Sequence, residues 1–195
     1  MIGIIDYGAG NTTSVKNALS ELGVKFSLTS DSEELDKCDK IIFPGVGEAS
    51  SAMKRLKINS LDDYLGKSDK PVLGICLGMQ LLFDRSEENN TQCLGVIAGK
   101  VTRFNSENMK VPHMGWSKVK FEKETSLFDG IKTGEYFYFA NSYYAPVNDF
   151  SIAATNYNGL FSSAVNKGNF WGVQFHPEKS GKAGLKLLEN FIKLC

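Results

Sequence analysis

Hydrophobic residues in the first half of the chain form short apolar runs that alternate with segments of helical spacing. Buried strands are predicted over residues 2–5, 24–28, 40–43 and 71–75. Helices are predicted over 15–22, 32–35 and 48–61, and Gly23 is expected to end the first of them. Strands that alternate with helices favour a parallel sheet with helices on both faces.

The pattern changes after residue 90, where the periodicity becomes that of strands. Strands are predicted over 101–104, 117–123, 135–144, 152–157, 161–165 and 170–175. Asn158-Gly159 and Lys167-Gly168 are typical of hairpin turns. No linker-like segment separates the halves, so we expect an antiparallel part joined to the same sheet, closed by a helix over 183–194. Residues 1–195 are therefore expected to form a single domain.

Composition and charge narrow the class of protein. The 22 basic and 22 acidic residues of this 195-residue chain cancel, which predicts no nucleic-acid partner and no anionic membrane surface. The first apolar run is too short for a signal peptide or a membrane span. Four scattered cysteines without a Cys-x-x-Cys pair argue against zinc and against disulfides, and suit a reducing, cytoplasmic location.

Cys76 stands in a Gly-x-Cys-x-Gly segment, between the strand over 71–75 and helix-forming residues over 77–83. Such a turn leaves room for a strained backbone and lifts the central side chain clear of the sheet. A helix N-terminus beside Cys76 would favour its thiolate, which is the nucleophilic form. A buried cysteine in a glycine-tolerant turn remains the alternative.

Two other strand ends carry glycine-rich loops. Residues 44–47, Pro-Gly-Val-Gly, follow the strand over 40–43, so they can lie beside Cys76 at the carboxyl edge of a parallel sheet. Residues 6–11 hold two glycines of a dinucleotide fingerprint, but Thr13 stands where the third belongs. We interpret this second loop as a helix cap and not as a nucleotide site.

A histidine and a glutamate follow the last predicted strand. The residues at 171, 173 and 175 are apolar and alternate, so they are expected to face the core while His176 points to the opposite side. Pro177 favours an extended backbone at His176, which would bring out Glu178 on the same face. A carboxylate that orients an imidazole can activate a thiol. The alternative is a His-Pro turn with a solvated glutamate.

The cysteine turn, the upstream Pro-Gly-x-Gly loop and the late His-Pro-Glu, in this order, resemble the class I glutamine amidotransferases over nearly the whole chain. The resemblance implies an α/β, flavodoxin-like fold: a mainly parallel central sheet, helices on both faces and an antiparallel extension in the C-terminal half. Residues 6–11, 44–47, 111–116 and 176–180 further resemble the glutaminase subunits of imidazole glycerol phosphate synthases. Val-Pro-His-Met-Gly-Trp at 111–116 is the most discriminating of these segments.

The resemblance implies a Cys-His-Glu triad. Cys76 would attack the side-chain amide of glutamine and form a glutamyl thioester. His176 would take up the thiol proton and then protonate the leaving ammonia, while Glu178 fixes the imidazole ring. Backbone N–H groups of Leu77 and of Val46 or Gly47 would form the oxyanion hole, after a backbone flip that the two glycines of the loop permit.

Substrate-binding residues follow from the same resemblance. Gln80 lies four residues after Cys76 on one helical face and matches a substrate contact, and Glu88 matches a ligand of the substrate amino group. The backbone of Ser142 and Tyr143 would hold the substrate carboxylate. The chain departs from the common pattern at Asn141, where the family usually has histidine.

Four residues are implied at an interface: Asn11, Met114, Trp116 and Lys179. His113 resembles part of a structural and interface loop and not a rival catalytic base. The implied partner is a separate (β/α)8 cyclase subunit that receives the ammonia and forms imidazole glycerol phosphate and an aminoimidazole carboxamide ribotide. We expect a heterodimer in histidine biosynthesis that uses no cofactor and no metal.

Two alternative functions stay open. The chain could be a paralogous glutaminase that supplies ammonia to another amidotransferase, such as one that modifies a sugar of a surface polysaccharide, and Asn141 keeps that option open. A non-catalytic regulatory subunit on the same fold is the more distant alternative, and the presence of Cys76, His176 and Glu178 together argues against it.

Overall fold

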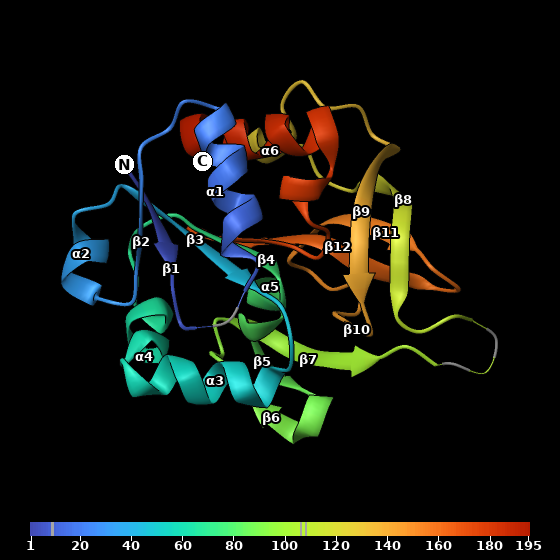
Figure 1. Cartoon of the computed structure of the whole chain (residues 1–195). Coiled ribbons are helices and arrows are strands. Elements are labelled where there is room, and N and C mark those ends of the chain that lie inside the picture. Colours follow the sequence, from blue (N-terminus) through green and yellow to red (C-terminus); the bar gives the residue numbers. More distant parts are fainter. Residues whose placement is uncertain (9, 106, 108) are drawn as a thin grey trace.

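A computed structural model describes residues 1–8, 10–105, 107 and 109–195. Its main sheet has the strand order β2-β1-β3-β4-β13-β12-β11-β8-β9 (Figure 1). The parallel strands are β2 (Phe26–Thr29), β1 (Ile2–Ile5), β3 (Lys40–Gly45), β4 (Val72–Cys76) and β13 (Phe170–Val173). The antiparallel extension consists of β12 (Leu160–Lys167), β11 (Ser151–Asn156), β8 (His113–Phe121) and β9 (Glu135–Asn141).

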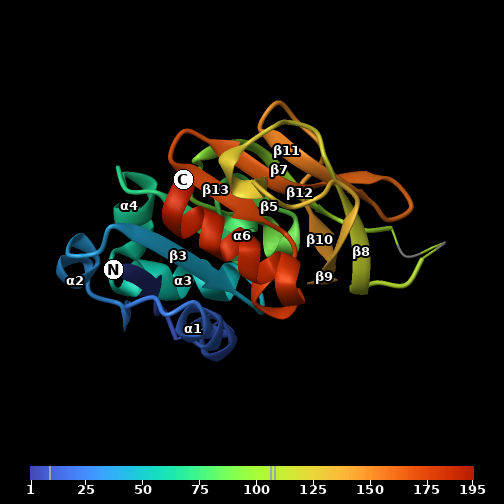
Figure 2. The ribbon, with the colours of Figure 1, turned by 90° about the horizontal axis from the view of Figure 1, so that it is seen from above.

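Strand β13 joins the two halves of the chain. It pairs in parallel with β4 and antiparallel with β12, so the C-terminal strands continue the N-terminal sheet. The prediction that the second half joins the same sheet as an antiparallel extension is therefore confirmed. Figure 2 shows the antiparallel strands at the end of the molecule opposite α2 (Ser32–Asp36).

Helices cover both faces of the sheet, as predicted (Figure 1). One face carries α1 (Thr12–Glu21) and α6 (Gly181–Leu194), and the other carries α3 (Ala49–Ile58), α4 (Leu61–Gly66) and α5 (Leu77–Leu81). Successive residues of a strand point to opposite faces, so Ile42 packs toward α1 and α6 while Ile41 and Phe43 pack toward α3 to α5. None of the described helices is long and apolar enough to cross a membrane.

Two predicted helices differ from the structure. The helix predicted over 48–61 ends at Ile58, and a separate helix, α4, begins at Leu61, because Ser60 takes a left-handed backbone with φ of +53°. The helix-forming segment over 77–83 ends at Leu81, and Phe83 starts strand β5 (Phe83–Ser86). Residues 77–81 are helical as the spacing predicts, but Phe83 pairs with Ile97 and is therefore part of a strand.

Strand β5 belongs to a smaller second sheet that the sequence did not predict as a unit. Its order is β10-β7-β5-β6, with β10 at Tyr143–Tyr144, β7 at Ile97–Arg103 and β6 at Thr91–Gln92. The strand predicted over 135–144 is split into two strands: β9 ends at residue 141 in the main sheet, and β10 begins at residue 143 in the second sheet. Three short 3-10 turns complete the described elements: η1 (Glu88–Asn90), η2 (Ser126–Phe128) and η3 (Pro177–Lys179).

Candidate active site

Cys76 occupies the strained turn that the sequence predicts. It ends β4 with φ of +54° and ψ of −109°, and α5 begins at the next residue. Helix α5 packs directly on the sheet, since a Cβ on Gly78 would lie 1.9 Å from the carbonyl oxygen of Phe43. A Cβ on Gly74 would lie 2.8 Å from the backbone of Gly78. Both glycines are required because the backbones touch.

His176 and Glu178 are brought together by a turn. His176 has an extended backbone, but the chain then enters η3, so Glu178 reaches the imidazole from a 3-10 turn. The prediction of one extended segment was wrong at this point, yet Nδ1 of His176 and Oε1 of Glu178 lie 2.8 Å apart. Both side chains are buried, with 4% and 1% exposure. The ring is thus fixed by the carboxylate.

The charge of His176 depends on its two neighbours. Burial on its own lowers the pKa of His176, but side-chain hydrogen bonds to Cys76 and Glu178 outweigh it and raise that pKa to about 10. The ring is therefore an imidazolium at neutral pH, with Nδ1–H donating to Glu178. A positive charge beside a cysteine favours the thiolate, so the arrangement suits nucleophilic attack by Cys76.

A pocket of about 350 Å³ opens beside Cys76. Of the predicted site residues, its lining includes Val46, Gly47, Cys76, Leu77, Gln80, Glu88, Ser142, Tyr143, His176 and Lys179. Glu178 contacts His176 and is not part of this lining. Segments from both halves of the chain thus meet at the carboxyl edge of the parallel strands, where such sheets place their ligands.

The loop predicted to contribute to the oxyanion hole lies next to the nucleophile. Gly45 stands opposite Cys76 in the ladder between β3 and β4, so Val46 and Gly47 follow directly at the pocket. A Cβ on Gly45 would lie 2.6 Å from the Gly78 nitrogen, which holds that residue in place. Gly47 has φ of +98° and free space around it. Conformational freedom of this loop therefore resides at Gly47 and not at Gly45.

Gln80 is held by a chain of amide hydrogen bonds. Its Nε2 donates to the carbonyl oxygen of Tyr143 and to Oε1 of Gln174, each at 2.8 Å. Asn141 Nδ2 donates to the same Tyr143 oxygen at 2.9 Å. Gln174 Nε2 in turn lies 3.7 Å from Cys76 Sγ. Sequence reasoning missed Gln174, although strand alternation places it on the same side as His176.

Glu88 connects the pocket to helix α3. The helix that starts after Cys76 has already ended, and Glu88 opens η1 instead. Its Oε2 accepts a hydrogen bond from the backbone nitrogen of Ala49 at 2.7 Å. Burial raises the pKa of Glu88, against the lowering effect of that bond. The carboxylate thus caps a helix and lines the pocket at once.

Of the predicted interface residues, Lys179 lines the pocket, while Met114 and Trp116 are exposed on strand β8. Met114 and Trp116 are alternate residues of β8, and they are 64% and 54% exposed beside Tyr136 of β9 at 47%. We call Met114, Trp116 and Tyr136 the apolar face. Lys179 is exposed with Nζ over the Tyr138 ring, which also contacts Trp116 edge-on. Asn11, at the start of α1, is half-buried and donates to Ser14.

His113 is buried in an aromatic cluster and does not line the pocket, although its neighbour Pro112 does. Its ring stacks on Tyr157 with centroids 3.9 Å apart and on Phe139 at 4.8 Å, and Nε2 lies 2.9 Å from Ser117 Oγ. Burial lowers the pKa of His113 to about 4. A neutral, stacked imidazole fits a structural role.

Replacing His113 by phenylalanine is expected to reduce acid destabilisation. An unfolded histidine takes up a proton near pH 6.5, whereas folded His113 stays neutral to about pH 4, so its stabilising contribution is lost as pH falls between these values. Between pH 7 and pH 4 the free energy of unfolding of the native protein should fall by roughly 3 kcal/mol more than that of the variant. Urea unfolding of both proteins from pH 7 to pH 4 measures it. Parallel stability curves would contradict the assignment.

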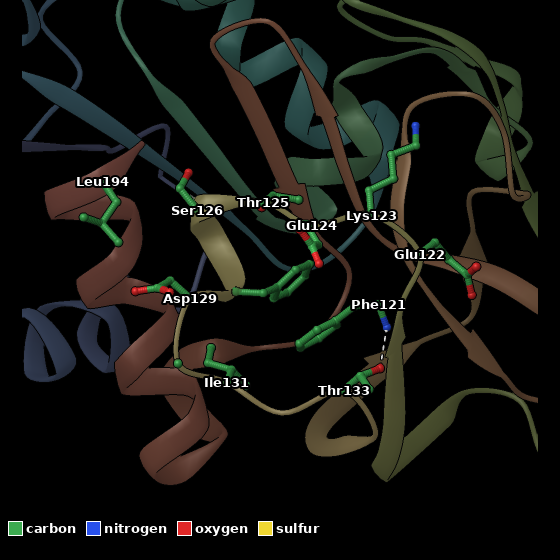
Figure 3. A pocket seen from close by; sticks show the side chains of 12 residues that line it. Phe121, Glu122, Lys123, Glu124, Thr125, Ser126, Asp129, Ile131, Thr133 and Leu194 are labelled. Carbon is green, nitrogen blue, oxygen red and sulfur yellow. Dashed lines mark hydrogen bonds between the residues drawn. The ribbon is translucent and has the colours of Figure 1, made fainter.

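A larger groove lies elsewhere on the molecule. It has a volume of about 830 Å³ and is lined by residues between Phe121 and Thr133 together with Leu194 (Figure 3). The rings of Phe121 and Phe128, which both line it, stack with centroids 3.9 Å apart. Its size exceeds that of the pocket at Cys76, but the predicted chemistry lies in the smaller pocket.

Comparison with known proteins gives consistent matches over the whole chain. The family model described as glutamine amidotransferase class-I matches residues 3–195. "Imidazole glycerol phosphate synthase subunit HisH" of Methanocaldococcus jannaschii is 51% identical over 197 residues, which cover 100% of both chains. The protein of the same name from Bacteroides fragilis is 48% identical over 195 residues, 99% of both chains.

Solved structures with low sequence identity share the fold. A glutamine amidotransferase structure superposes with a TM-score of 0.77 at 20% identity, covering 99% of this chain and 97% of the other. The structure of PurLQS from Thermotoga maritima gives a TM-score of 0.72 at 19% identity, covering 98% of this chain and 96% of the other. The prediction of a flavodoxin-like α/β fold with a mainly parallel sheet is confirmed.

Proposed function

The chain belongs to the class I glutamine amidotransferase family, and from this premise we propose that it is the glutaminase subunit of an imidazole glycerol phosphate synthase. It hydrolyses glutamine to glutamate and passes the ammonia to a separate (β/α)8 cyclase subunit. The single observation that supports this most is that Cys76 and His176 line the same small pocket while Glu178 Oε1 lies 2.8 Å from His176 Nδ1.

The proposed reaction begins at Cys76. Its thiolate attacks the side-chain carbonyl carbon of glutamine, and the oxyanion receives hydrogen bonds from the backbone nitrogens of Leu77 and of Val46 or Gly47. The His176 imidazolium gives its proton to the leaving nitrogen, which departs as ammonia and leaves a glutamyl thioester. His176 then removes a proton from water, which releases glutamate and regenerates Cys76.

We propose that other residues lining the pocket recognise the substrate. Gln80 and Glu88 offer a carbonyl oxygen and a carboxylate, both of which suit the ammonium group of glutamine. Ser142 and Tyr143 also line the pocket, and their backbone groups would hold the substrate carboxylate. A pocket of about 350 Å³ accommodates a single amino acid.

The partner is proposed to dock beside the pocket, on the apolar face. Large exposed apolar side chains that adjoin one another are typical of interaction sites. Tyr138 connects this face to the catalytic histidine, because its carbonyl oxygen accepts from the His176 nitrogen at 2.8 Å. Lys179, whose Nζ lies over the Tyr138 ring, and Asn11 would make polar contacts with the partner. A partner seated here would enclose the ammonia.

The remaining proposals concern organisation. We propose that residues 1–195 form one domain, that the active complex is a heterodimer with lyase as well as glutaminase activity, and that it works in the cytoplasm. Glutamine is the substrate, and neither a cofactor nor a metal takes part in the proposed steps.

A second candidate function rests on Asn141. This residue replaces the histidine usual in the family, and its amide holds the Tyr143 carbonyl at the substrate wall. A changed wall or interface would suit a paralogous glutaminase that supplies ammonia to a sugar-modifying amidotransferase.

The proposed function predicts activation by the cyclase. The purified chain should hydrolyse glutamine slowly on its own, and the rate of hydrolysis should rise strongly when the cyclase and its ribonucleotide ligand are added. Replacing Trp116 by alanine should weaken binding to the cyclase about thirtyfold or more, because large aromatic anchors dominate interfaces. Calorimetric titration and a glutaminase assay measure both effects.

The matched control is Ile58→Ala, which removes a large apolar side chain that is 79% exposed on α3. It should leave cyclase binding unchanged. Growth without histidine of a host that lacks its own glutaminase subunit separates the two candidate functions. A chain that neither restores this growth nor responds to the cyclase would contradict the histidine-pathway assignment.

A further inference from the structure

Gln174 links the nucleophile to the substrate wall. Its side chain is fully buried, its Nε2 lies 3.7 Å from Cys76 Sγ, and its Oε1 accepts from Gln80 Nε2 at 2.8 Å. We propose that Gln174 is a further residue of the active site, which stabilises the Cys76 thiolate and fixes the orientation of Gln80. This inference rests on the proposed glutaminase function.

The orientation of Gln80 follows from counting its hydrogen-bonding groups. A primary amide carries two N–H donors and one carbonyl acceptor. Both donors of Gln80 are directed to protein oxygens, one on Tyr143 and one on Gln174. Its Oε1 is therefore the group left for a ligand in the pocket that Gln80 lines. An acceptor at this position selects an ammonium group and disfavours a carboxylate.

Gln174 and the Tyr143 carbonyl oxygen together disfavour the opposite orientation of Gln80. If the Gln80 amide were reversed, its oxygen would face Oε1 of Gln174 and the carbonyl oxygen of Tyr143, and three acceptors would be left without a proton between them. Gln174 itself cannot reverse without turning its Oε1 toward the Cys76 sulfur. The two amides and the nucleophile are thus oriented together.

The contact with sulfur matters at two steps of the proposed reaction. Cys76 is a thiolate before attack on glutamine and again when water displaces it from the thioester. An N–H donor strengthens when its acceptor is ionised. Unlike His176, the amide of Gln174 does not lose its proton during the reaction, so it stabilises the thiolate at both steps.

The position of Gln174 is set by the sheet. Its backbone nitrogen donates to the Ser163 carbonyl oxygen on β12 at 2.9 Å, directly after the end of β13. The strand alternation that buries Val173 and Phe175 on one side directs Gln174 to the side of the nucleophile. A buried, hydrogen-bonded side chain on a sheet is well suited to holding reacting groups in place.

Replacing Gln174 by methionine tests the proposal, with the cyclase complex assayed throughout. Methionine has similar length but no N–H donor. Loss of one hydrogen bond to an ionised group should lower kcat about tenfold to a hundredfold. The pH midpoint of inactivation by iodoacetamide, followed as loss of glutaminase activity, should rise by about one unit. KM for glutamine should rise about fivefold, because the Gln80 side chain loses its hydrogen bond to Gln174.

A double-mutant cycle with Gln80→Met separates the two roles. If Gln174 acts on KM through Gln80, Gln174→Met should raise KM no further in the Gln80→Met background. The alkylation midpoint should still shift in that background, since it reports on Cys76. A purely structural role of Gln174 would move neither quantity selectively.

Ser163→Ala is the matched control. Ser163 is equally buried beside Gln174, and its Oγ has no hydrogen-bond partner among the described residues. It should leave KM and the alkylation midpoint unchanged. If Gln174→Met does not fold, Gln174→Asn, whose amide is too short for either contact, should give the same shifts.

The outcomes distinguish this inference from the proposed function. An unchanged alkylation midpoint together with unchanged KM in the folded variant would overturn the role of Gln174 while the native chain remained a glutaminase. A native chain without glutaminase activity beside the cyclase would contradict the proposed function itself. Co-elution of the variant chain with the cyclase on size-exclusion chromatography, together with its circular dichroism spectrum, confirms that the variant chain is folded and docked.

Discussion

Replacing Cys76 by alanine is expected to abolish glutamine-dependent synthesis by the complex, while ammonia-dependent synthesis continues. The thiolate is the only proposed nucleophile, and the thioester cannot form without it. The imidazolium of His176 and its contact to Glu178 cannot substitute, because neither attacks the amide. Removal of the nucleophile from comparable triads leaves only the catalysis that binding and the oxyanion hole supply.

The expected loss is large and specific. kcat for glutamine hydrolysis should fall by at least about four orders of magnitude. Synthesis from added ammonium salt should stay within about twofold, because it bypasses the pocket at Cys76. Glutamate release and cyclase product formation, measured on the same preparation, separate these activities.

Cys38→Ala is the matched control for this variant. Cys38 is also buried, but its sulfur donates to the Glu34 carbonyl oxygen, and Cys38 does not line the pocket at Cys76. It should retain glutamine-dependent synthesis. A Cys76→Ala complex that still used glutamine would show that the triad assignment is wrong.

The sequence predicted the alternating core of the fold well, since the apolar runs of β1, β3 and β4 are dictated by burial on both faces. It could not predict which strands pair. β13 lies beside β4, a neighbour almost a hundred residues earlier, and local periodicity carries no information about that distance. Tertiary packing decides the order of strands.

The errors occurred where local and tertiary preferences differ. Leu77 to Phe83 is helix-forming by composition, but α5 stops at Leu81 because Phe83 pairs in the second sheet. Glu178 was expected on an extended segment and lies instead in η3, where Pro177 starts the turn. Phe83 is nevertheless buried, and Glu178 nevertheless contacts His176, so only the backbone conformation differs from the prediction.

The parts of the site that short sequence motifs determine could be predicted, and the parts formed by contacts between distant segments could not. The Gly-x-Cys-x-Gly turn and the His-Pro-Glu segment carry their geometry in a few residues. The amide chain from Tyr143 through Gln80 to Gln174 joins three separate elements, so no local pattern could reveal it. Gln174 also follows an apolar strand directly in the sequence, between the buried residues Val173 and Phe175, so its polar side chain carries no local sign of a role in the site.

Replacing Gly78 by alanine is expected to prevent stable folding. The new Cβ would lie 1.9 Å from the carbonyl oxygen of Phe43, well inside any allowed contact. Neither partner can give way easily, because Phe43 is in the central strand β3 and Gly78 in the helix that follows Cys76. The free energy of unfolding should fall by at least about 3 kcal/mol, measured by urea denaturation or as loss of soluble protein.

Gly66→Ala is the control that isolates this steric effect from loss of a glycine. Gly66 ends α4, and no atom lies within 4 Å of a Cβ built there. Alanine should therefore leave stability unchanged or raise it by up to about 1 kcal/mol through helix propensity. If Gly78→Ala were as stable as Gly66→Ala, helix α5 would not pack on β3 as closely as described.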